Sequence, residues 1–128
     1  MKRIILVFLL IFTICSFASF AEEEACTANE ENKSAVKNEY TVTVDVYAYC
    51  FSSSRTATGT TPCYGTIAVD PGLIPLGSKI YVPNYGWGRA LDTGGAIKGK
   101  KIDIWFPTKQ ECIKWGVRTL KIKVVPKK

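Results

Sequence analysis

The sequence predicts a mainly β fold, a small six-stranded barrel with one short helix, stabilised by disulfides. Six short segments are rich in branched and aromatic residues, as β-strands are. Pro-Gly, Pro-Leu-Gly, Asn-Tyr-Gly and Gly-Gly turn signals separate them. Because all six fall within residues 40–128, we expect the sheet to close on itself, which leaves no unpaired edge.

The first strand segment, YTVTVDVYAY, alternates between apolar and polar positions. This period of two predicts a half-buried strand. One face carries Val42, Val44, Val46 and Ala48, and the other carries Thr43, Asp45, Tyr47 and Tyr49. The later strand segments, in chain order, are GTIAVD, SKIYVP, WGRALD, KKIDIWF and RTLKIKVV.

One helix is expected over the segment KQECIKW. Thr108, followed three residues later by Glu111, forms a capping box, and Pro107 ends the strand before it. Gly116 then ends the helix after about two turns.

Residues 1–21 have the pattern of a cleaved signal peptide. Lys2 and Arg3 precede an apolar run, and the small residues Ser19 and Ala21 stand where signal peptidase cuts. An uncleaved membrane anchor is the alternative, but the run is short for a stable membrane span. The mature protein is therefore expected to be secreted, without a membrane span.

Two regions follow the signal peptide. Residues 22–39 are acidic and lack apolar periodicity, which predicts a disordered segment. Residues 40–128 form the barrel domain.

Four cysteines remain after the signal peptide, an even number that predicts two disulfides in a small exported protein. Three pairings are possible, and we expect Cys50 to pair with Cys63 and Cys26 with Cys112. Zinc is the competing interpretation. Because the chain has no His and no C-x-x-C spacing, no metal site is predicted.

The composition restricts the chemistry. With no His, neither a Ser-His-Asp triad nor a Cys-His pair is available, so acid–base catalysis must come from other groups such as carboxylates. From residue 40 onward five Asp and Glu stand against thirteen Lys and Arg. A basic exported domain can meet nucleic acid, an anionic membrane surface or an anionic wall polymer, and export disfavours nucleic acid.

Three aspartates stand out. In KKIDIWF, strand alternation places Asp103 and Trp105 on one face, and an indole beside a carboxyl group is typical of a sugar site. An exposed strand aspartate is the plain alternative. Asp92 in ALDTGG resembles the catalytic element of an aspartic protease, although Asp is also a common turn former, as Asp70 before Pro-Gly is.

Together these aspartates match a family pattern. The segments GTIAVDPGLIPLGSKIYVP, ALDTGGAIKGKKIDIWF and KWGVRTLKIKVV, with TATG before them, resemble the bacterial 3D domain from about residue 47 to residue 125. In that family Asp70, Asp92 and Asp103 occupy the three positions that give the domain its name.

The resemblance implies a double-psi β-barrel. Relatives of the 3D domain include stationary-phase survival lytic transglycosylases and, more distantly, the catalytic barrel of membrane-bound lytic transglycosylase A. These enzymes cleave the MurNAc–GlcNAc bond of peptidoglycan and leave a 1,6-anhydro end. The resemblance implies that Asp103 is the acid/base. We expect Asp92 to hold the muramyl C6 hydroxyl or to raise the pKa of Asp103 by like-charge proximity, and Asp70 to orient its neighbours. We expect a monomer that needs no cofactor, acts at the cell wall and has peptidoglycan glycan strands as its partner.

Substrate contacts are expected around the aspartates. They involve Thr58 in TATG, the backbone N–H groups of Gly94, Gly95 and Lys98, and a stacking face on Trp105. The Lys98 ammonium group is suited to a stem-peptide carboxylate, although a solvated surface lysine is the alternative.

The sequence is also compatible with two other functions. Double-psi barrels also occur as wall-binding or wall-loosening modules that do not cut glycan. A dimeric aspartic protease is the minor alternative, because the chain lacks a convincing later apolar-apolar-Gly element to complete such a site.

Overall fold

The structure is a computed structural model and describes residues 38–50 and 54–128. The predicted signal peptide, residues 1–21, and nearly all of the predicted acidic segment, residues 22–39, lie outside the described residues. Within the described part of the chain, no helix is long and apolar enough to cross a membrane.

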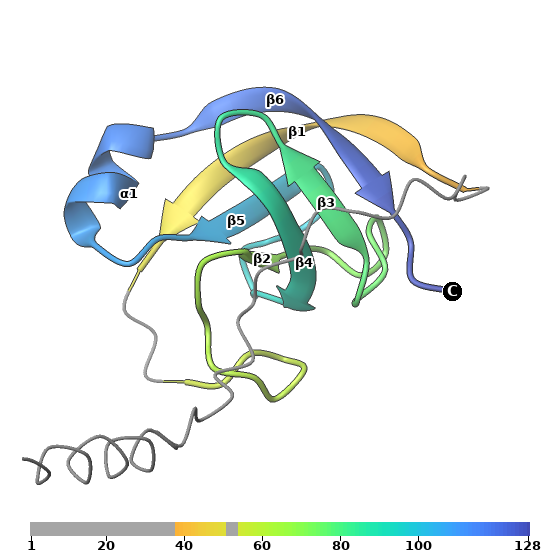
Figure 1. Cartoon of the computed structure of the whole chain (residues 1–128), viewed down its shortest axis with the longest axis horizontal. Coiled ribbons are helices and arrows are strands. Elements are labelled where there is room, and N and C mark those ends of the chain that lie inside the picture. The colour runs from red at the N-terminus through yellow and green to blue at the C-terminus, as the bar shows by residue number, and fades with distance from the viewer. Residues whose placement is uncertain (1–37, 51–53) are drawn as a thin grey trace, which may run out of the picture.

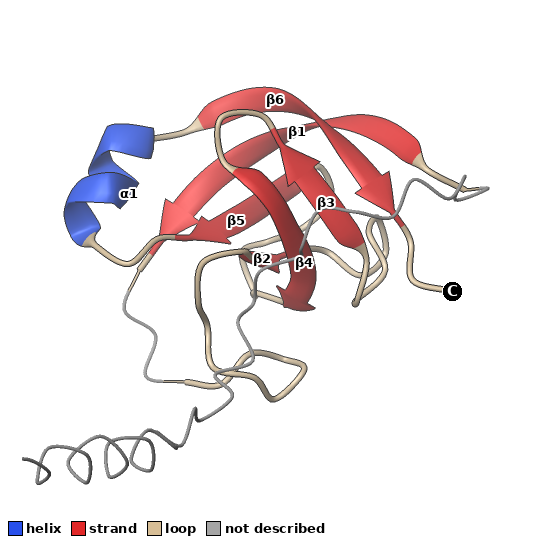
Figure 2. Cartoon of the chain, in the orientation of Figure 1, coloured by secondary structure: helices blue, strands red, loops and turns tan. Residues whose placement is uncertain are grey.

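Six strands close into one barrel, which confirms the predicted fold class (Figures 1 and 2). The strands run in the order β1-β5-β2-β4-β3-β6 around the barrel. The pairs β1/β5 and β2/β4 are parallel, and the other pairs are antiparallel. The elements are β1 (Tyr40–Tyr49), β2 (Thr66–Ala68), β3 (Lys79–Val82), β4 (Gly86–Asp92), β5 (Lys101–Trp105), α1 (Lys109–Trp115) and β6 (Arg118–Val125).

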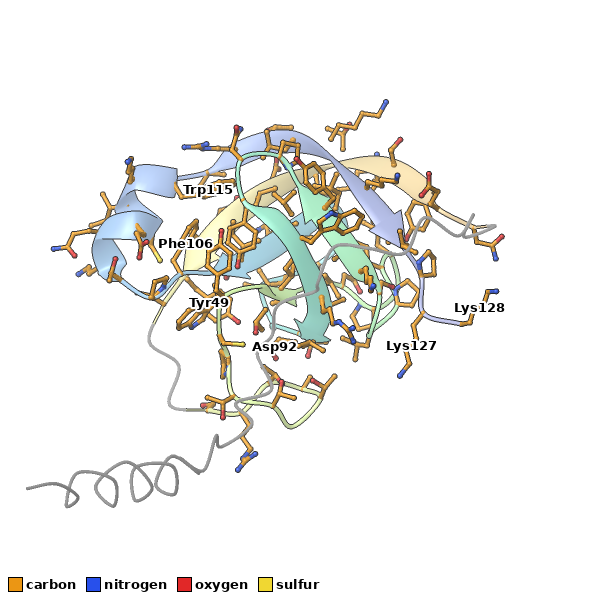
Figure 3. The ribbon with its side chains drawn as sticks, in the orientation of Figure 1. Tyr49, Asp92, Phe106, Trp115, Lys127 and Lys128 are labelled. Carbon is orange, nitrogen blue, oxygen red and sulfur yellow. The ribbon has the colours of Figure 1, made fainter. Side chains whose placement is uncertain are left out.

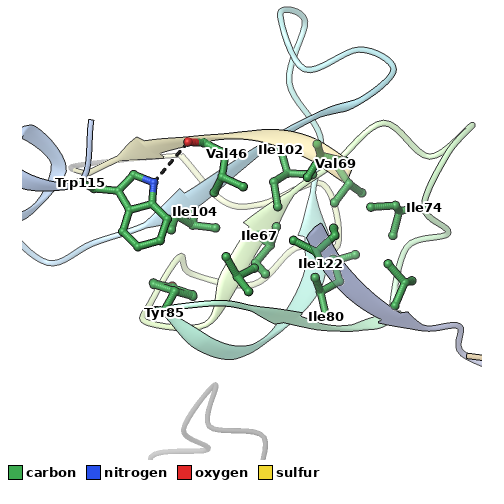
Figure 4. Packing of buried hydrophobic residues seen from close by; sticks show 14 residues of the cluster. Val46, Ile67, Val69, Ile74, Ile80, Tyr85, Ile102, Ile104, Trp115 and Ile122 are labelled. Atoms are coloured by element: carbon green, nitrogen blue, oxygen red, sulfur yellow. Dashed lines mark hydrogen bonds between the residues drawn. The ribbon is translucent and has the colours of Figure 1, made fainter. Parts of the chain in front are cut away.

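The barrel interior is filled by branched side chains (Figure 4). The predicted alternation holds, since Val44 and Val46 of β1 and Ile102 and Ile104 of β5 point inward and are buried. Burying one such side chain contributes roughly 1.5–3 kcal/mol. Because the interior is packed with apolar side chains, polar chemistry belongs to the outer wall and the rims.

The predicted helix and its capping box are both present. Thr108 accepts a hydrogen bond from the Glu111 N–H, and Glu111 accepts one from the Thr108 N–H. The helix α1 lies beside the ends of β1 and β5 (Figure 1). Its Trp115 is buried, and the indole N–H donates to the Val46 carbonyl at 3.2 Å. The buried Trp115 therefore helps to fix the helix to the barrel.

The predicted cysteine pairing is wrong. Cys50 and Cys112 are free thiols that lie 3.8 Å apart, and Cys63 forms a disulfide with neither. The reason is the path of the chain. Cys50 follows the end of β1 and lies beside α1. The loop before Cys63 instead runs to the end of β4, where the Thr58 N–H donates to the Leu91 carbonyl at 3.1 Å. Cys26 lies outside the described residues.

Candidate active site

Asp103 and Asp92 lie on one face of the barrel wall, with Ala68 between them. Ala68 of β2 is the register partner of Asp103 in β5 and, after an irregularity in β2, of Asp92 in β4. Directly paired residues point to the same face of a sheet, and two strand spacings separate their Cα atoms by about 10 Å. Since Ala68 has only a methyl group, both carboxyl groups can face the same space.

Gly88, which has no side chain, allows β2 and β4 to approach each other closely. A Cβ atom at Gly88 would stand only 2.6 Å from the Gly65 carbonyl oxygen, so any other residue would force the strands apart. The Arg89 N–H donates to that same carbonyl at 2.8 Å. Glycine at position 88 therefore supports the spacing of the two aspartates.

Asp103 has the properties of a proton donor. Its side chain is half-buried, and its Oδ1 atom is buried without a hydrogen-bond partner in the described part of the protein. Burial, assisted by the negative charge of Asp92, raises the pKa of Asp103 to about 6. At pH 7 about a tenth of the molecules then carry a proton on this carboxyl group. Leaving a buried polar atom unpaired costs roughly 1–3 kcal/mol, so the unpartnered Oδ1 atom makes Asp103 a candidate for chemistry or binding.

Asp92 is held by the TATG loop. Its Oδ1 atom accepts hydrogen bonds from the Ala57 N–H at 2.9 Å and from the Thr93 N–H at 2.8 Å. The Thr58 hydroxyl donates to the Leu91 carbonyl at 2.8 Å, which ties the loop to β4. Thr58 is thus engaged with the backbone beside Asp92.

The Asp70 side chain accepts hydrogen bonds from two separate loops, the one that follows it and the one between β4 and β5. Its Oδ2 atom accepts from the Gly99 N–H at 2.7 Å, and its Oδ1 atom accepts from the Gly72 N–H at 3.0 Å. These two bonds, with the Lys98 charge, hold the pKa of Asp70 below its usual value. Gly99 has a φ of 62°, a conformation that glycine adopts without strain. The carboxylate therefore fixes the connection between β4 and β5.

The remaining predicted residues surround this arrangement. Gly94, Gly95 and Lys98 all lie in the connection between β4 and β5, where Gly95 and Lys98 are exposed. Trp105 lies two residues after Asp103 in β5 and is half-buried like it. Alternation thus places the indole and the carboxyl group on the same outer face, as expected.

The structure adds Tyr49, which the sequence analysis did not assign to the site. Tyr49 is the last residue of β1 and the register partner of Trp105. Its hydroxyl is buried and, like Asp103 Oδ1, has no hydrogen-bond partner in the part of the chain that is described. Burial and then the charges of Asp92 and Asp103 raise the pKa of Tyr49 well above its usual range. Figure 3 shows Tyr49 and Asp92 on the same side of the barrel.

Alternation alone already placed Tyr49 on the polar face of its strand. What it did not reveal is the parallel pairing with β5, a segment about fifty residues later in the chain. The position of Ala68 could not be recognised from the sequence, because alanine has no reactive or polar side chain.

Within the described residues no group of three or more His, Cys, Asp or Glu is arranged to hold a metal ion. The chemistry that the site itself offers is proton transfer by Asp103 next to a second carboxylate.

Comparisons with known proteins agree with the aspartate pattern. A family model described as "3D domain" matches residues 65–126. The cell wall-binding protein YocH of Bacillus subtilis is 48% identical over 110 residues, covering 81% of this chain and 38% of YocH. YabE of the same organism, provisionally named a cell wall shaping protein, is 45% identical over 115 residues, covering 80% of this chain and 28% of YabE. The chain therefore spans well under half the length of these relatives.

Among solved structures, a crystal structure of MltA from Escherichia coli, described as having a unique lytic transglycosylase fold, matches with a TM-score of 0.45 and 25% identity. The match covers 58% of this chain and 28% of MltA.

Proposed function

Since residues 65–126 are a 3D domain, we propose that this protein is an exported peptidoglycan lytic transglycosylase. It cleaves the bond between MurNAc and GlcNAc and leaves a 1,6-anhydro-MurNAc end. The names of the relatives, cell wall-binding and cell wall shaping proteins, support a substrate in the wall. The peptidoglycan reaction itself is implied by the family resemblance of the three aspartates.

One observation supports catalysis above all others: Asp103 is a half-buried carboxyl group whose pKa is raised to about 6. An ordinary surface aspartate is almost fully ionised at neutral pH and makes a poor acid. A raised pKa near the working pH suits a general acid, because a useful fraction of the molecules carries the proton.

The proposed reaction needs one carboxyl group in two steps. Protonated Asp103 donates its proton to the glycosidic oxygen as the bond to C1 of MurNAc breaks. The resulting carboxylate then accepts the proton of the muramyl C6 hydroxyl as that oxygen bonds to C1. The proton taken up in the second step restores Asp103, and no water is consumed. A hydrolase instead usually needs a second carboxylate to activate water or attack carbon.

The other aspartates support this acid. Burial and then the negative charge of Asp92 raise the pKa of Asp103, and the Asp92 Oδ1 atom is held by two backbone N–H groups. Asp70 acts through geometry, by holding the connection that carries Gly94, Gly95 and Lys98. In this proposal that connection supplies backbone donors to the substrate, and Trp105 supplies a stacking face.

The test is digestion of purified sacculi with the mature protein, followed by mass spectrometry of the soluble products. The proposal expects muropeptides with 1,6-anhydro-MurNAc ends. Products with reducing MurNAc ends would show a hydrolase instead.

A non-catalytic wall-binding module is the second candidate. The name of the relative YocH, a cell wall-binding protein, favours it. Retention of the protein on sacculi without release of soluble product would support this candidate over the first.

The dimeric aspartic protease remains the minor alternative, because Asp92, the last residue of β4, begins an Asp-Thr-Gly sequence. It requires two copies of the chain and cleavage of an unfolded protein. A monomer in solution that leaves casein intact is the expected result, and cleavage blocked by a statine-type inhibitor would support the protease.

A further inference from the structure

Tyr49 is unusual among the buried tyrosine hydroxyls of this barrel. The hydroxyl of Tyr85 has two partners, since it donates to the Trp105 carbonyl and accepts from the Gly65 N–H, both at 2.8 Å. The hydroxyl of Tyr49 is also buried but has no partner in the described residues. The Tyr85 hydroxyl thus both donates and accepts a hydrogen bond, whereas the Tyr49 hydroxyl does neither within the described residues.

The unpartnered hydroxyl lies close to the proposed acid. Tyr49 and Asp103 belong to adjacent parallel strands, two register positions apart on the same outer face. Tyr49 Oη and Asp103 Oδ1 are the two buried side-chain oxygen or nitrogen atoms without a partner in the described chain. They do not bond to each other, so each is free to bind a third group.

The surrounding charge restricts what that group can be. Burial, and then the negative charges of Asp92 and Asp103, raise the pKa of Tyr49 and keep its hydroxyl protonated. The hydroxyl is therefore a hydrogen-bond donor and not a base. The same charges repel an anionic acceptor such as a stem-peptide or lactyl carboxylate. An uncharged oxygen, such as a sugar hydroxyl or an acetamido carbonyl, fits both conditions.

We infer that Tyr49 is a glycan-binding residue of the Asp103 site, whose hydroxyl donates a hydrogen bond to an uncharged oxygen of the sugar bound beside Asp103. The inference rests on the proposed function in one respect, that the ligand is a peptidoglycan glycan. It makes the glycan itself, and not the stem peptide, the part recognised next to the acid.

The test uses Tyr49→Phe, which removes only the hydroxyl, and glycan strands freed of stem peptides by an amidase. Binding is compared in the Asp103→Asn background so that the strands stay intact. We expect Tyr49→Phe to weaken binding roughly 3- to 10-fold, the worth of one hydrogen bond to a neutral acceptor. The melting temperature should not fall, because the lost hydroxyl has no partner in the free protein. Tyr81→Phe, an exposed tyrosine of β3, is the matched control and should bind as the background does.

The outcomes separate this inference from the proposed function. Equal binding by Tyr49→Phe and its background, or a fall in melting temperature with the loss of binding, would overturn the role of Tyr49. Failure of the background protein to bind peptide-free strands would also overturn it. If Tyr49→Phe weakens binding while the unsubstituted protein releases no anhydro product, Tyr49 stands as a glycan contact and the transglycosylase proposal fails.

Discussion

Asp92 and Asp103 share one face of the barrel wall, joined through their common register partner Ala68. The two carboxyl groups belong to different strands and are held differently. Asp92 accepts two backbone hydrogen bonds, whereas Asp103 has an oxygen with no partner in the described residues. In the proposed mechanism this asymmetry lets Asp92 act as a fixed charge and leaves Asp103 to carry the proton.

The first prediction concerns that charge. Asp92→Asn removes the negative charge that assists burial in raising the pKa of Asp103. Because burial remains, the pKa should fall only part of the way towards its ordinary value of 3.8. The alkaline limb of the pH–rate profile should move down by the same amount. Asp45→Asn is the control, since Asp45 accepts from the Thr119 hydroxyl where β1 pairs with β6. An unmoved profile for Asp92→Asn would show that Asp92 does not act on Asp103.

The second prediction concerns stability. The folded pKa of Asp103, about 6, lies above the ordinary value of 3.8, so the folded state binds more protons between these pH values. Its stability must then decrease as pH rises from about 4 to about 6. Asp103→Asn removes this loss and should stabilise the protein at pH 7 by about 1–2 kcal/mol, allowing for the partial exposure of the carboxyl group.

Urea denaturation of both proteins at pH 7 and at pH 3.5 checks this effect. The difference should be present at pH 7 and nearly absent at pH 3.5. A variant less stable than the parent at pH 7 would mean that the Asp103 carboxylate contributes to folding.

The third prediction assigns Asp70 to structure. An amide at position 70 keeps one acceptor oxygen, so either the Gly72 N–H or the Gly99 N–H loses its partner. Asp70→Asn should therefore lower the melting temperature and the activity together. Because the folded pKa is lowered, the stability from Asp70 is present above its ordinary value of 3.8 and is lost as pH falls through the folded pKa. The gap between parent and variant, followed by thermal melts, should close in strong acid; a gap that persists there would point to a cause other than the carboxylate.

The fourth prediction concerns Cys50 and Cys112, whose thiols lie 3.8 Å apart. Burial and contact with Cys50 raise the pKa of Cys112 to about 11. Little of this thiol is therefore in the reactive thiolate form at neutral pH. In an oxidising compartment we expect a disulfide between them that stabilises the fold by roughly 3–5 kcal/mol. Peptide mapping of oxidised, unreduced protein should find this link, and Cys50→Ser should leave a thiol that can be labelled at Cys112. Thiol labelling of both cysteines after oxidation would contradict the prediction.

The fold could be predicted because its signals are local. Alternation in β1 and β5, the turn residues between strands and the capping box at Thr108 each depend on neighbouring residues, and the structure has all of them. The pairing of distant segments has no such local signal. For this reason the sequence analysis separated Cys50 from Cys112 and did not place Tyr49 beside Asp103.

The candidate site was predictable to the same degree. The three aspartates could be named from their motifs, and strand alternation put Trp105 on the face of Asp103. Which aspartate anchors a loop and which is left without a partner depends on backbone N–H groups from the segments at Ala57 and Gly99. Those contacts exist only once the barrel has closed.

The central claim is that Asp103 is the acid of a lytic transglycosylase, and one comparison tests it most directly. Purified sacculi are digested with the mature protein and with Asp103→Asn, and anhydromuropeptides are quantified by mass spectrometry, with retention on sacculi measured alongside. Removing a positioned general acid should reduce release of these products by roughly 10²–10⁴-fold while retention and folding persist. Near-equal release by Asp103→Asn, or no anhydro product from the unsubstituted protein, would contradict the claim.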